Sequence, residues 1–380
     1  VGSGPTRDGI PRAAPTTTTT KRRLQRRMIP LEVLQQPLQA GVRNYYRIRD
    51  MHVRAMSNGC YAVVTNICKG CHGNFGTQLD VAAVGYEWIN HSMQPTRLAT
   101  HDFRVTIGEG RALPYSASIF NISAMSFGAL SANAILALNE GARRGRFAHD
   151  TGEGSISRHH KQNGGDLIWE IGSGYFGCRN PDGSFSEERF AENARLEQVK
   201  MIELKLSQGA KPGHGGVLPG AKVTPEIAEA RGVPVGVDCI SPASHGAFST
   251  PIGMMHFIER LRELSGGKPT GFKLCIGHPW EWFAIAKAMQ QTGIVPDFIV
   301  VDGAEGGTGA APLEFTDHVG APLQEGLLLV HNTLVGLNLR SRIKIGCAGK
   351  VVGAFNAPFR IAAQKRHLAP LTLPRPEERE

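Results

Sequence analysis

A glycine-rich loop is the first stretch of this chain whose composition suggests chemistry. The segment from Asp302 to Gly309 follows an apolar run and contains four glycines. Because glycine has no Cβ, the backbone N–H groups of such a loop can approach a phosphate or a ribityl chain closely. The segment 346–350, after a later apolar run, is a second and weaker candidate phosphate loop. The alternative for the first loop is a glycine-rich turn that binds no ligand.

Two lysines, Lys205 and Lys273, each lie inside an apolar, strand-like run. A lysine that faces the interior of a sheet is costly unless it meets an anion. The N1/O2 edge of a flavin, which gains negative charge on reduction, would be such a partner. An ion pair with a neighbouring carboxylate is the alternative.

A third lysine, Lys211, lies in the glycine-rich segment 208–216, directly after the run that contains Lys205. A lysine held at a strand end could bind a substrate carboxylate or donate a proton. An exposed loop lysine is the alternative. His214 could serve as an acid or base, although a loop histidine is more often only exposed. The segment 150–154 carries two acids after another run, but by itself it is nonspecific.

The elements that must position these residues alternate along the chain from Ser116 onward. Strands are expected at 119–123, 201–205, 235–240, 271–275, 298–301 and 343–346. Helices with recognisable caps and stops are expected at about 224–232, 254–266 and 279–293. Such alternation indicates parallel strands.

We therefore predict an α/β fold, a (β/α)₈ barrel in which the carboxyl ends of the strands carry the active site. The loops that begin at Met125, Gln208 and Asp302 all follow strands, so they would meet at that end. An open, doubly wound sheet is the alternative, but no Gly-x-Gly-x-x-Gly pattern follows the first strand.

The charge of the chain is concentrated at its amino end. Residues 1–60 hold 11 Lys and Arg against 3 Asp and Glu, which accounts for +8 of the net +9. The remainder is nearly neutral, so the sequence gives no electrostatic argument for nucleic-acid binding by the folded part. We expect a basic, low-complexity, disordered tail at 1–60, with a targeting presequence as the alternative. A lead-in segment at 61–115, the barrel at 116–362 and a tail rich in proline and charge at 363–380 would follow.

Cysteine content and hydropathy bear on location and metals. Seven cysteines, some inside apolar runs, favour a reducing compartment. No run reaches the roughly 18 apolar residues of a membrane helix, and no signal peptide opens the chain, so we expect no membrane span and a cytoplasmic location. The pattern Cys68-x-x-Cys71-His72 matches haem attachment or half of a zinc site. We favour neither and predict no metal.

The stretch from about Phe75 to Arg360 resembles the FMN-binding synthase domain of glutamate synthases, and most closely the stand-alone glutamate synthase-related proteins. The motifs that carry this resemblance are the segments 75–80, 123–128, 150–154, 208–216 and 301–309. These motifs occur in the order found in that family, and the stretch that resembles it spans about three quarters of the chain.

The resemblance implies a barrel that holds FMN and reduces an imine. In that family 2-iminoglutarate, formed from 2-oxoglutarate and ammonia, is reduced to L-glutamate by hydride transfer from reduced FMN. The positions that would contact FMN are Ala124, Met125, Ser126, Glu170, Lys205, Lys273, Asp302, Gly303, Gly306, Gly307 and Gly349. Those that would contact the substrate are Gln208, Lys211 and Ser241, and Lys211 is the implied catalytic residue. Glu170 stands where glutamate synthases carry a flavin-contacting Gln.

Several departures from the family limit the prediction. We expect no glutaminase domain and therefore ammonia from another source. Val217 stands where the family has a substrate-binding Gln, and His214 replaces a Glu, so a substrate other than 2-oxoglutarate is the alternative. After Ala362 the family's last strand and cysteine cluster are not recognisable. We therefore expect a barrel without its last strand and helix, no iron–sulfur cluster and an unidentified electron donor. Two alternatives stay open: a truncated, inactive barrel, and another FMN barrel such as a 2-hydroxy-acid oxidase, which would need a His base and an Arg clamp.

Overall fold

The structure is a computed structural model that describes residues 93, 102–209, 211, 215–306, 311, 314–315 and 318–349. The predicted tails at 1–60 and 363–380, the cysteine motif at 68–72 and the motif at 75–80 lie outside the described residues.

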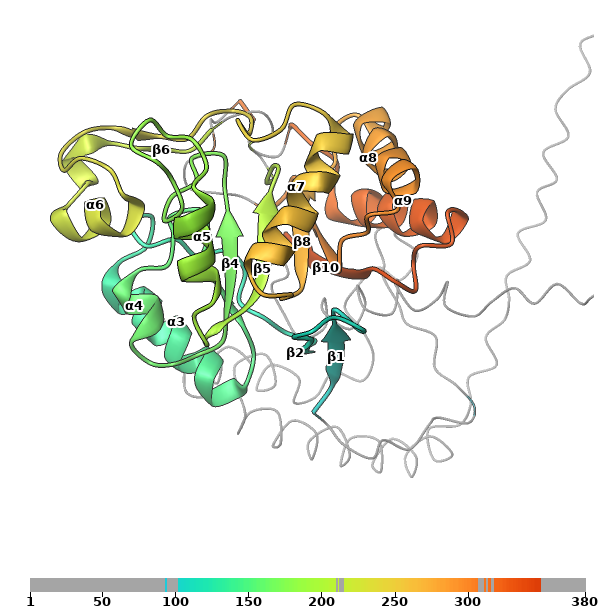
Figure 1. The fold of residues 1–380 in the computed structure, drawn as a ribbon, viewed down its shortest axis with the longest axis horizontal. Helices are drawn as coiled ribbons and strands as arrows, with labels where there is room; N and C mark the ends of the chain where they lie inside the picture. The colour runs from blue at the N-terminus through green and yellow to red at the C-terminus, as the bar shows by residue number, and fades with distance from the viewer. Residues whose placement is uncertain are drawn as a thin grey trace, which may run out of the picture. The chain divides into compact units, whose positions relative to one another are not determined.

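The centre of the fold is one six-stranded parallel sheet with the order β10-β9-β8-β5-β4-β3 (Figure 1). Its strands are β3 (His149–Asp150), β4 (Leu167–Ile171), β5 (Val199–Lys205), β8 (Thr270–Cys275), β9 (Phe298–Asp302) and β10 (Lys344–Ala348). Ile122 adds a parallel bridge to His149 beside β3. Neighbours in the sheet follow one another along the chain, whereas a doubly wound sheet reverses its order. The predicted α/β fold of barrel type is confirmed as a curled parallel sheet.

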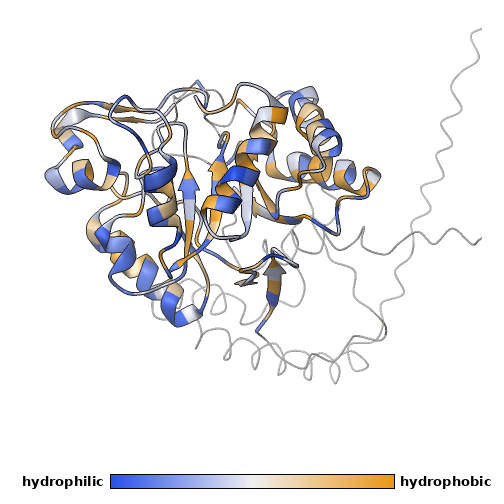
Figure 2. Cartoon of the chain, viewed as in Figure 1, coloured by the Kyte–Doolittle hydropathy of each residue, from blue (hydrophilic) through white to orange (hydrophobic). Residues whose placement is uncertain are grey.

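Helices connect the strands. They are α3 (Ala132–Gly145), α4 (Arg158–Lys161), α5 (Glu187–Ala194), α6 (Pro225–Arg231), α7 (Pro251–Leu264), α8 (Pro279–Thr292) and α9 (Leu323–Gly336), with a short 3₁₀ turn at Gly220–Lys222. Of these, α5, α7, α8 and α9 pack on one face of the sheet, whereas α6 packs in a separate cluster with β6 (Val217–Leu218) and β7 (Cys239–Ile240). The Thr224 hydroxyl accepts the N–H of Ile227 at the start of α6, which ends at Gly232 with φ of +67°. This confirms the predicted cap and stop. In Figure 2, α3 and α7 each carry hydrophilic and hydrophobic residues, as expected of helices that cover a sheet.

Two predicted strands, 119–123 and 235–240, are wrong. In the first, Ile122 forms only an isolated bridge. The second is interrupted. Only β7 (Cys239–Ile240) is extended, and it pairs antiparallel with β6 (Val217–Leu218), outside the parallel sheet. Gly236 has φ of +73° and donates its N–H to the Val223 carbonyl, so a turn interrupts the apolar run. Val235 and Val237 are 55% and 53% exposed and bury no strand face.

Side chains alternate along the sheet strands, as period-two geometry requires. On β4, Leu167, Trp169 and Ile171 pack with the helices, whereas Ile168 and Glu170 face the opposite, inner side. The inner face is therefore partly polar, although the strands are buried along their length. Sequence analysis did not anticipate β4.

A β-hairpin closes the amino end of the inner face. It consists of β1 (Arg104–Ile107) and β2 (Tyr115–Ser118). Its buried apolar residues form one cluster with residues from the starts of the sheet strands: Ile107, Tyr115, Ala117, Ala148, Ile168, Met201 and Phe298. This apolar floor keeps water away from the inner face on that side.

Asp297 ties the hairpin, the sheet and a covering helix together. Its carboxylate accepts from Arg111 Nε of the hairpin at 2.7 Å, from Arg262 Nε of α7 at 3.1 Å and from the Thr270 N–H of β8 at 2.9 Å. The Arg262 and Asp297 side chains are only 4% and 5% exposed. Loss of Asp297 would leave the buried Arg262 with only the partly exposed Glu259 as its ion-pair partner, and the buried Thr270 N–H without its acceptor.

We therefore predict that Asp297→Ala lowers the free energy of unfolding by about 3–5 kcal/mol, as for a broken buried ion pair. Urea unfolding of the purified chain measures this loss. Glu187→Ala is the matched control, because it removes the exposed partner of Arg260 and should change stability little. Equal effects of the two substitutions would contradict the role of Asp297.

Candidate functional site

The carboxyl ends of the sheet strands surround a cleft of about 390 Å³. Its lining residues are Glu153, Ser173, Lys205, Leu206, Ser207, Gln208, Lys211, Gly215, Gly216, Pro242 and Ala243. Loops after β3, β4, β5 and β7 thus contribute, as expected at the active end of a parallel α/β sheet. This volume includes space that is open to solvent.

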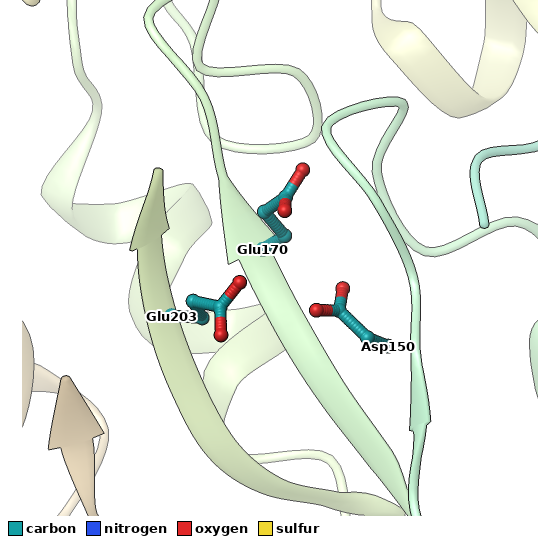
Figure 3. A group of neighbouring side chains, drawn as sticks. All are labelled: Asp150, Glu170 and Glu203. Atoms are coloured by element: carbon teal, nitrogen blue, oxygen red, sulfur yellow. The ribbon is translucent and has the colours of Figure 1, made fainter. Parts of the chain in front are cut away.

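Beneath this cleft the inner face carries three buried carboxyl groups. Asp150 of β3, Glu170 of β4 and Glu203 of β5 are 5%, 1% and 1% exposed. Figure 3 shows the three carboxyl groups gathered between neighbouring strands, and one oxygen of each lies within 4.8 Å of the others. The register of the parallel strands places them together.

Lys273 of β8 supplies the cation of this cluster. Its Nζ donates to Glu170 Oε2 and lies 3.4 Å from Glu203 Oε1. Burial alone would lower the pKa of Lys273, but the carboxylates of Glu170, Glu203 and Asp150 raise it well above its ordinary value. Lys273 is therefore an ammonium ion. The sequence allowed either a flavin edge or a neighbouring carboxylate as its partner, and the structure shows an ion pair with carboxylates.

The three carboxyl groups respond differently to their surroundings. Burial opposes ionisation of Glu170, but Lys273 and Lys205 outweigh it and lower its pKa. Burial, together with the charge of Glu170, raises the pKa of Asp150 to about 7. Burial and the charge of Asp150 raise the pKa of Glu203 well above its ordinary value. The two lysines thus favour the ionised form of Glu170, whereas burial and the neighbouring charges favour the neutral forms of Asp150 and Glu203.

Lys205 connects the cluster to the cleft. Its Nζ lies 3.6 Å from Glu170 Oε1 and donates to Glu153 Oε2 at 3.0 Å. The Lys205 and Glu153 side chains are 11% and 22% exposed and line the cleft. Gly172 and Gly216 leave room for Glu153, because a Cβ at either would lie within 3 Å of its side chain.

Lys211 lies at the cleft with 6% of its surface exposed. Burial lowers its pKa, and Lys205 adds to this, whereas Glu153 opposes it. Gln208 also lines the cleft. Ser241 is buried, with its N–H bonded to the Gly216 carbonyl at 2.8 Å. The three predicted substrate residues thus lie at or beside one cleft.

The predicted cofactor residues near the first strand lie beside the loop 150–154. Met125 donates its N–H to the Asp150 carbonyl at 3.0 Å. A Cβ at Gly152 would lie 2.8 Å from the Ser126 nitrogen, so only glycine permits this approach. Ala124, Met125 and Ser126 are half-buried, which leaves part of their surface open to a ligand.

The glycine-rich loop after β9 is held close to its neighbours. Asp302 Oδ2 accepts the N–H of Gly209 at 3.0 Å, and a Cβ at Gly209 would lie 1.8 Å from the Gly303 carbonyl oxygen. A Cβ at Gly306 would likewise lie 2.7 Å from the Gly349 Cα. These predicted cofactor residues meet at the ends of β9 and β10. Gly307 and His214 lie outside the described residues.

Sequence analysis missed Asp150, Glu153 and Glu203 as site residues. A usable signal existed for Glu203, because it lies two positions before Lys205 on the same strand and must share its face. Asp150 and Glu153 lie in a motif that was noticed but that is nonspecific alone. Their roles depend on β4, because its residue Glu170 contacts both Lys273 and Lys205.

No helix in the described ranges is both long and apolar enough to cross a membrane.

Comparison with known proteins identifies relatives of the chain. The family described as "Conserved region in glutamate synthase" matches residues 92–360. The glutamate synthase large subunit-like protein YerD of Bacillus subtilis is 44% identical over 239 residues, which cover 63% of this chain and 45% of that protein. The archaeal-type glutamate synthase [NADPH] of Thermotoga maritima is 36% identical over 230 residues, or 60% of this chain and 42% of that protein. The chain therefore spans less than half the length of these relatives.

We predict that Lys273→Met lowers the free energy of unfolding by about 3–5 kcal/mol, because it leaves buried carboxyl groups without their cation. The pKa values of these groups would rise further. A raised carboxyl pKa costs stability as pH climbs through it, so the loss should be larger at pH 8 than at pH 6. Urea unfolding at both pH values measures it.

Lys344→Met is the matched control, because Lys344 pairs at 3.1 Å with the exposed Glu109. It should cost less than about 1 kcal/mol at either pH. A Lys273→Met loss that did not change with pH would contradict the proposed charge balance.

Proposed function

The chain belongs to the glutamate synthase family, whose conserved region spans residues 92–360, and on this premise we propose that it is an FMN-dependent oxidoreductase of glutamate synthase type. The reaction is the reduction of an imine, formed from a 2-oxo acid and ammonia, to an amino acid. The proposed substrate is 2-oxoglutarate and the product L-glutamate. The electron donor is not assigned.

The observation that carries this proposal is the cleft, whose lining includes two lysines, Lys205 and Lys211, and the acid Glu153. A 2-oxo acid is an anion, and an ammonium group in a partly dry cleft binds a carboxylate strongly. Lys211 has no ion-pair partner among the residues that the structure describes, so it is the better candidate for this contact. The mixed charge of the lining suits a molecule that carries both a carboxylate and an imine.

The residues around the cleft fit a flavin. Lys205 keeps 11% of its side chain exposed, so its ammonium group can also face the N1/O2 edge of a ring that becomes negative on reduction. The half-buried backbone of Ala124, Met125 and Ser126 could pack against the ring. The glycines at 303, 306 and 349 lie at strand ends where a phosphate could approach the backbone. Reduced FMN would supply the hydride.

Each protein group then has a limited task. Lys211 binds and orients the substrate carboxylate. Lys205 stabilises negative charge in the cleft. Lys273 balances the negative charge of the Glu170 carboxylate. The predicted contact of Glu170 and Lys273 with the cofactor becomes an indirect one in this proposal, because both side chains are buried and paired with each other.

Oxidation of a 2-hydroxy acid is less well supported. That reaction needs a His base and an Arg carboxylate clamp in the cleft, and the lining residues of the described part of the chain supply lysines instead. His245 lies nearby but is bonded to the Lys205 carbonyl at 2.8 Å and to the Tyr175 hydroxyl at 3.3 Å.

We predict that Lys211→Ala slows the reoxidation of reduced, bound flavin by 2-oxoglutarate and ammonia roughly 100-fold, because a charge-assisted contact is lost. Stopped-flow absorbance of the flavin measures the rate. The bound flavin content should stay unchanged, since Lys211 is assigned to the substrate.

Lys222→Ala is the control, because Lys222 is exposed and outside the cleft lining. It should reoxidise at the normal rate. An unchanged rate in Lys211→Ala would contradict the substrate role of Lys211, whereas loss of flavin from that variant would move Lys211 to the cofactor site.

A further inference from the structure

We propose that Asp150 and Glu203 form a carboxyl pair that stores a proton beneath the cleft, and that alternating charged side chains connect this pair to the cleft. The proposal rests on the proposed function only for the reaction that would use the proton. The storage itself concerns the protein's own side chains.

The first argument is the count of charges in the cluster. Asp150, Glu170 and Glu203 lie within one buried group, and Lys273 is the ammonium ion inside it. Three carboxylates and one ammonium would leave two uncompensated negative charges in a medium where an unpaired charge is very costly. Within the cluster Lys205 reaches only Glu170, and because it also pairs with Glu153 at 3.0 Å it compensates at most one of these charges. At least one bound proton is needed to remove the remaining charge.

The second argument is where that proton sits. Lys273 and Lys205 both approach Glu170, which therefore stays ionised. Neither lysine makes an ion pair with Asp150 among the described contacts, and its carboxyl group accepts the Gly152 N–H at 2.9 Å. Carboxyl oxygens of Asp150 and Glu203 lie within 4.8 Å of each other. Two carboxyl groups this close cannot both ionise readily, so they share the proton.

The third argument is the continuous route outward. From the pair to the cleft the side chains alternate in charge, in the order Glu203, Lys273, Glu170, Lys205 and Glu153. The longest step joins Lys205 Nζ to Glu170 Oε1 at 3.6 Å. Asp302 of β9 is the further charged group that acts on Lys273, and it is held by the Gly209 N–H.

Proton release along this route balances simply. The Lys273 ammonium first gives a proton to Glu170, and the amine that remains takes the proton of Glu203, whose O–H bond breaks. In the same way, Lys205 gives a proton to Glu153 at the cleft and is reprotonated by Glu170. The net change is one proton fewer on the carboxyl pair and one more on Glu153. Imine reduction consumes a proton as well as a hydride, so this store would serve the proposed reaction.

A divalent cation is the competing occupant of the same carboxylates. Three carboxyl oxygens within 4.8 Å of one another could ligate one. However, the Lys273 ammonium already lies among them, and a cation would have to displace it against like-charge repulsion. We therefore assign the missing positive charge to a proton.

Infrared titration of the full chain without added ligand tests the proposal. At pH 8, where ordinary carboxyl groups are ionised, we expect the wild type to keep the C=O stretch of a protonated carboxyl group. This band should disappear in Glu203→Gln or in Asp150→Asn, and in the other variant it should shift. The two variants preserve side-chain shape, and thermal melts verify folding. Glu109→Gln, at an exposed carboxyl, is the control that should leave the band unchanged.

The route has its own readout in the same experiment. In Glu153→Gln we expect the band to remain, while its shift after transfer to D₂O becomes roughly tenfold slower or more, because the last proton acceptor is lost. Absence of the band from wild-type protein, a band unaffected by both pair variants, or stoichiometric divalent metal in the purified protein would each overturn the proton store. An unchanged exchange rate in Glu153→Gln would overturn the route. None of these readouts requires flavin binding or turnover, so failure of the proposed function would be seen separately.

Discussion

The ion pair between Lys273 and Glu170 is the interaction on which the rest of the site depends. Both side chains are almost fully buried, and neither charge could stay in the interior without the other. Lys273 also compensates Glu203, and Glu170 also receives Lys205 from the side of the cleft. The pair therefore connects the buried cluster to the open cleft. The strands and the hairpin around it hold these side chains in position.

Strand register and the apolar floor provide this setting. Parallel neighbours place Glu170 of β4 beside Glu203 of β5, and Lys205 beside Lys273 of β8. Beneath them the hairpin residues pack with Met201 and other strand-start residues, which excludes water and strengthens each electrostatic contact. At the other end, glycines allow the loops to approach one another closely. The fold thus confines water to the cleft side of the cluster.

Much of this arrangement could be predicted from the sequence, but its central feature could not. Strand and helix alternation gave the parallel α/β fold, and the inward lysines Lys205 and Lys273 were recognised from their apolar surroundings. The run 235–240 is apolar and therefore resembles a buried strand. The sequence does not indicate the turn at Gly236 that leaves its valines exposed. The carboxyl cluster depends on the pairing of three strands, including the overlooked β4, and single-strand patterns do not reveal which strands are neighbours. The resemblance to glutamate synthases pointed to the strand ends that line the cleft. Its assignment of Glu170 as a cofactor contact stays a prediction, and it did not reveal the pairing of Glu170 with Lys273.

The central claim is our proposal that the cleft above this cluster binds a flavin. It makes the protein an amino-acid-forming oxidoreductase. Its most direct test is the visible spectrum of the purified full chain, followed by heat release and chromatographic identification of the flavin. The account predicts a flavin spectrum and FMN in an amount equal to the protein. A colourless protein that takes up no added FMN would contradict it.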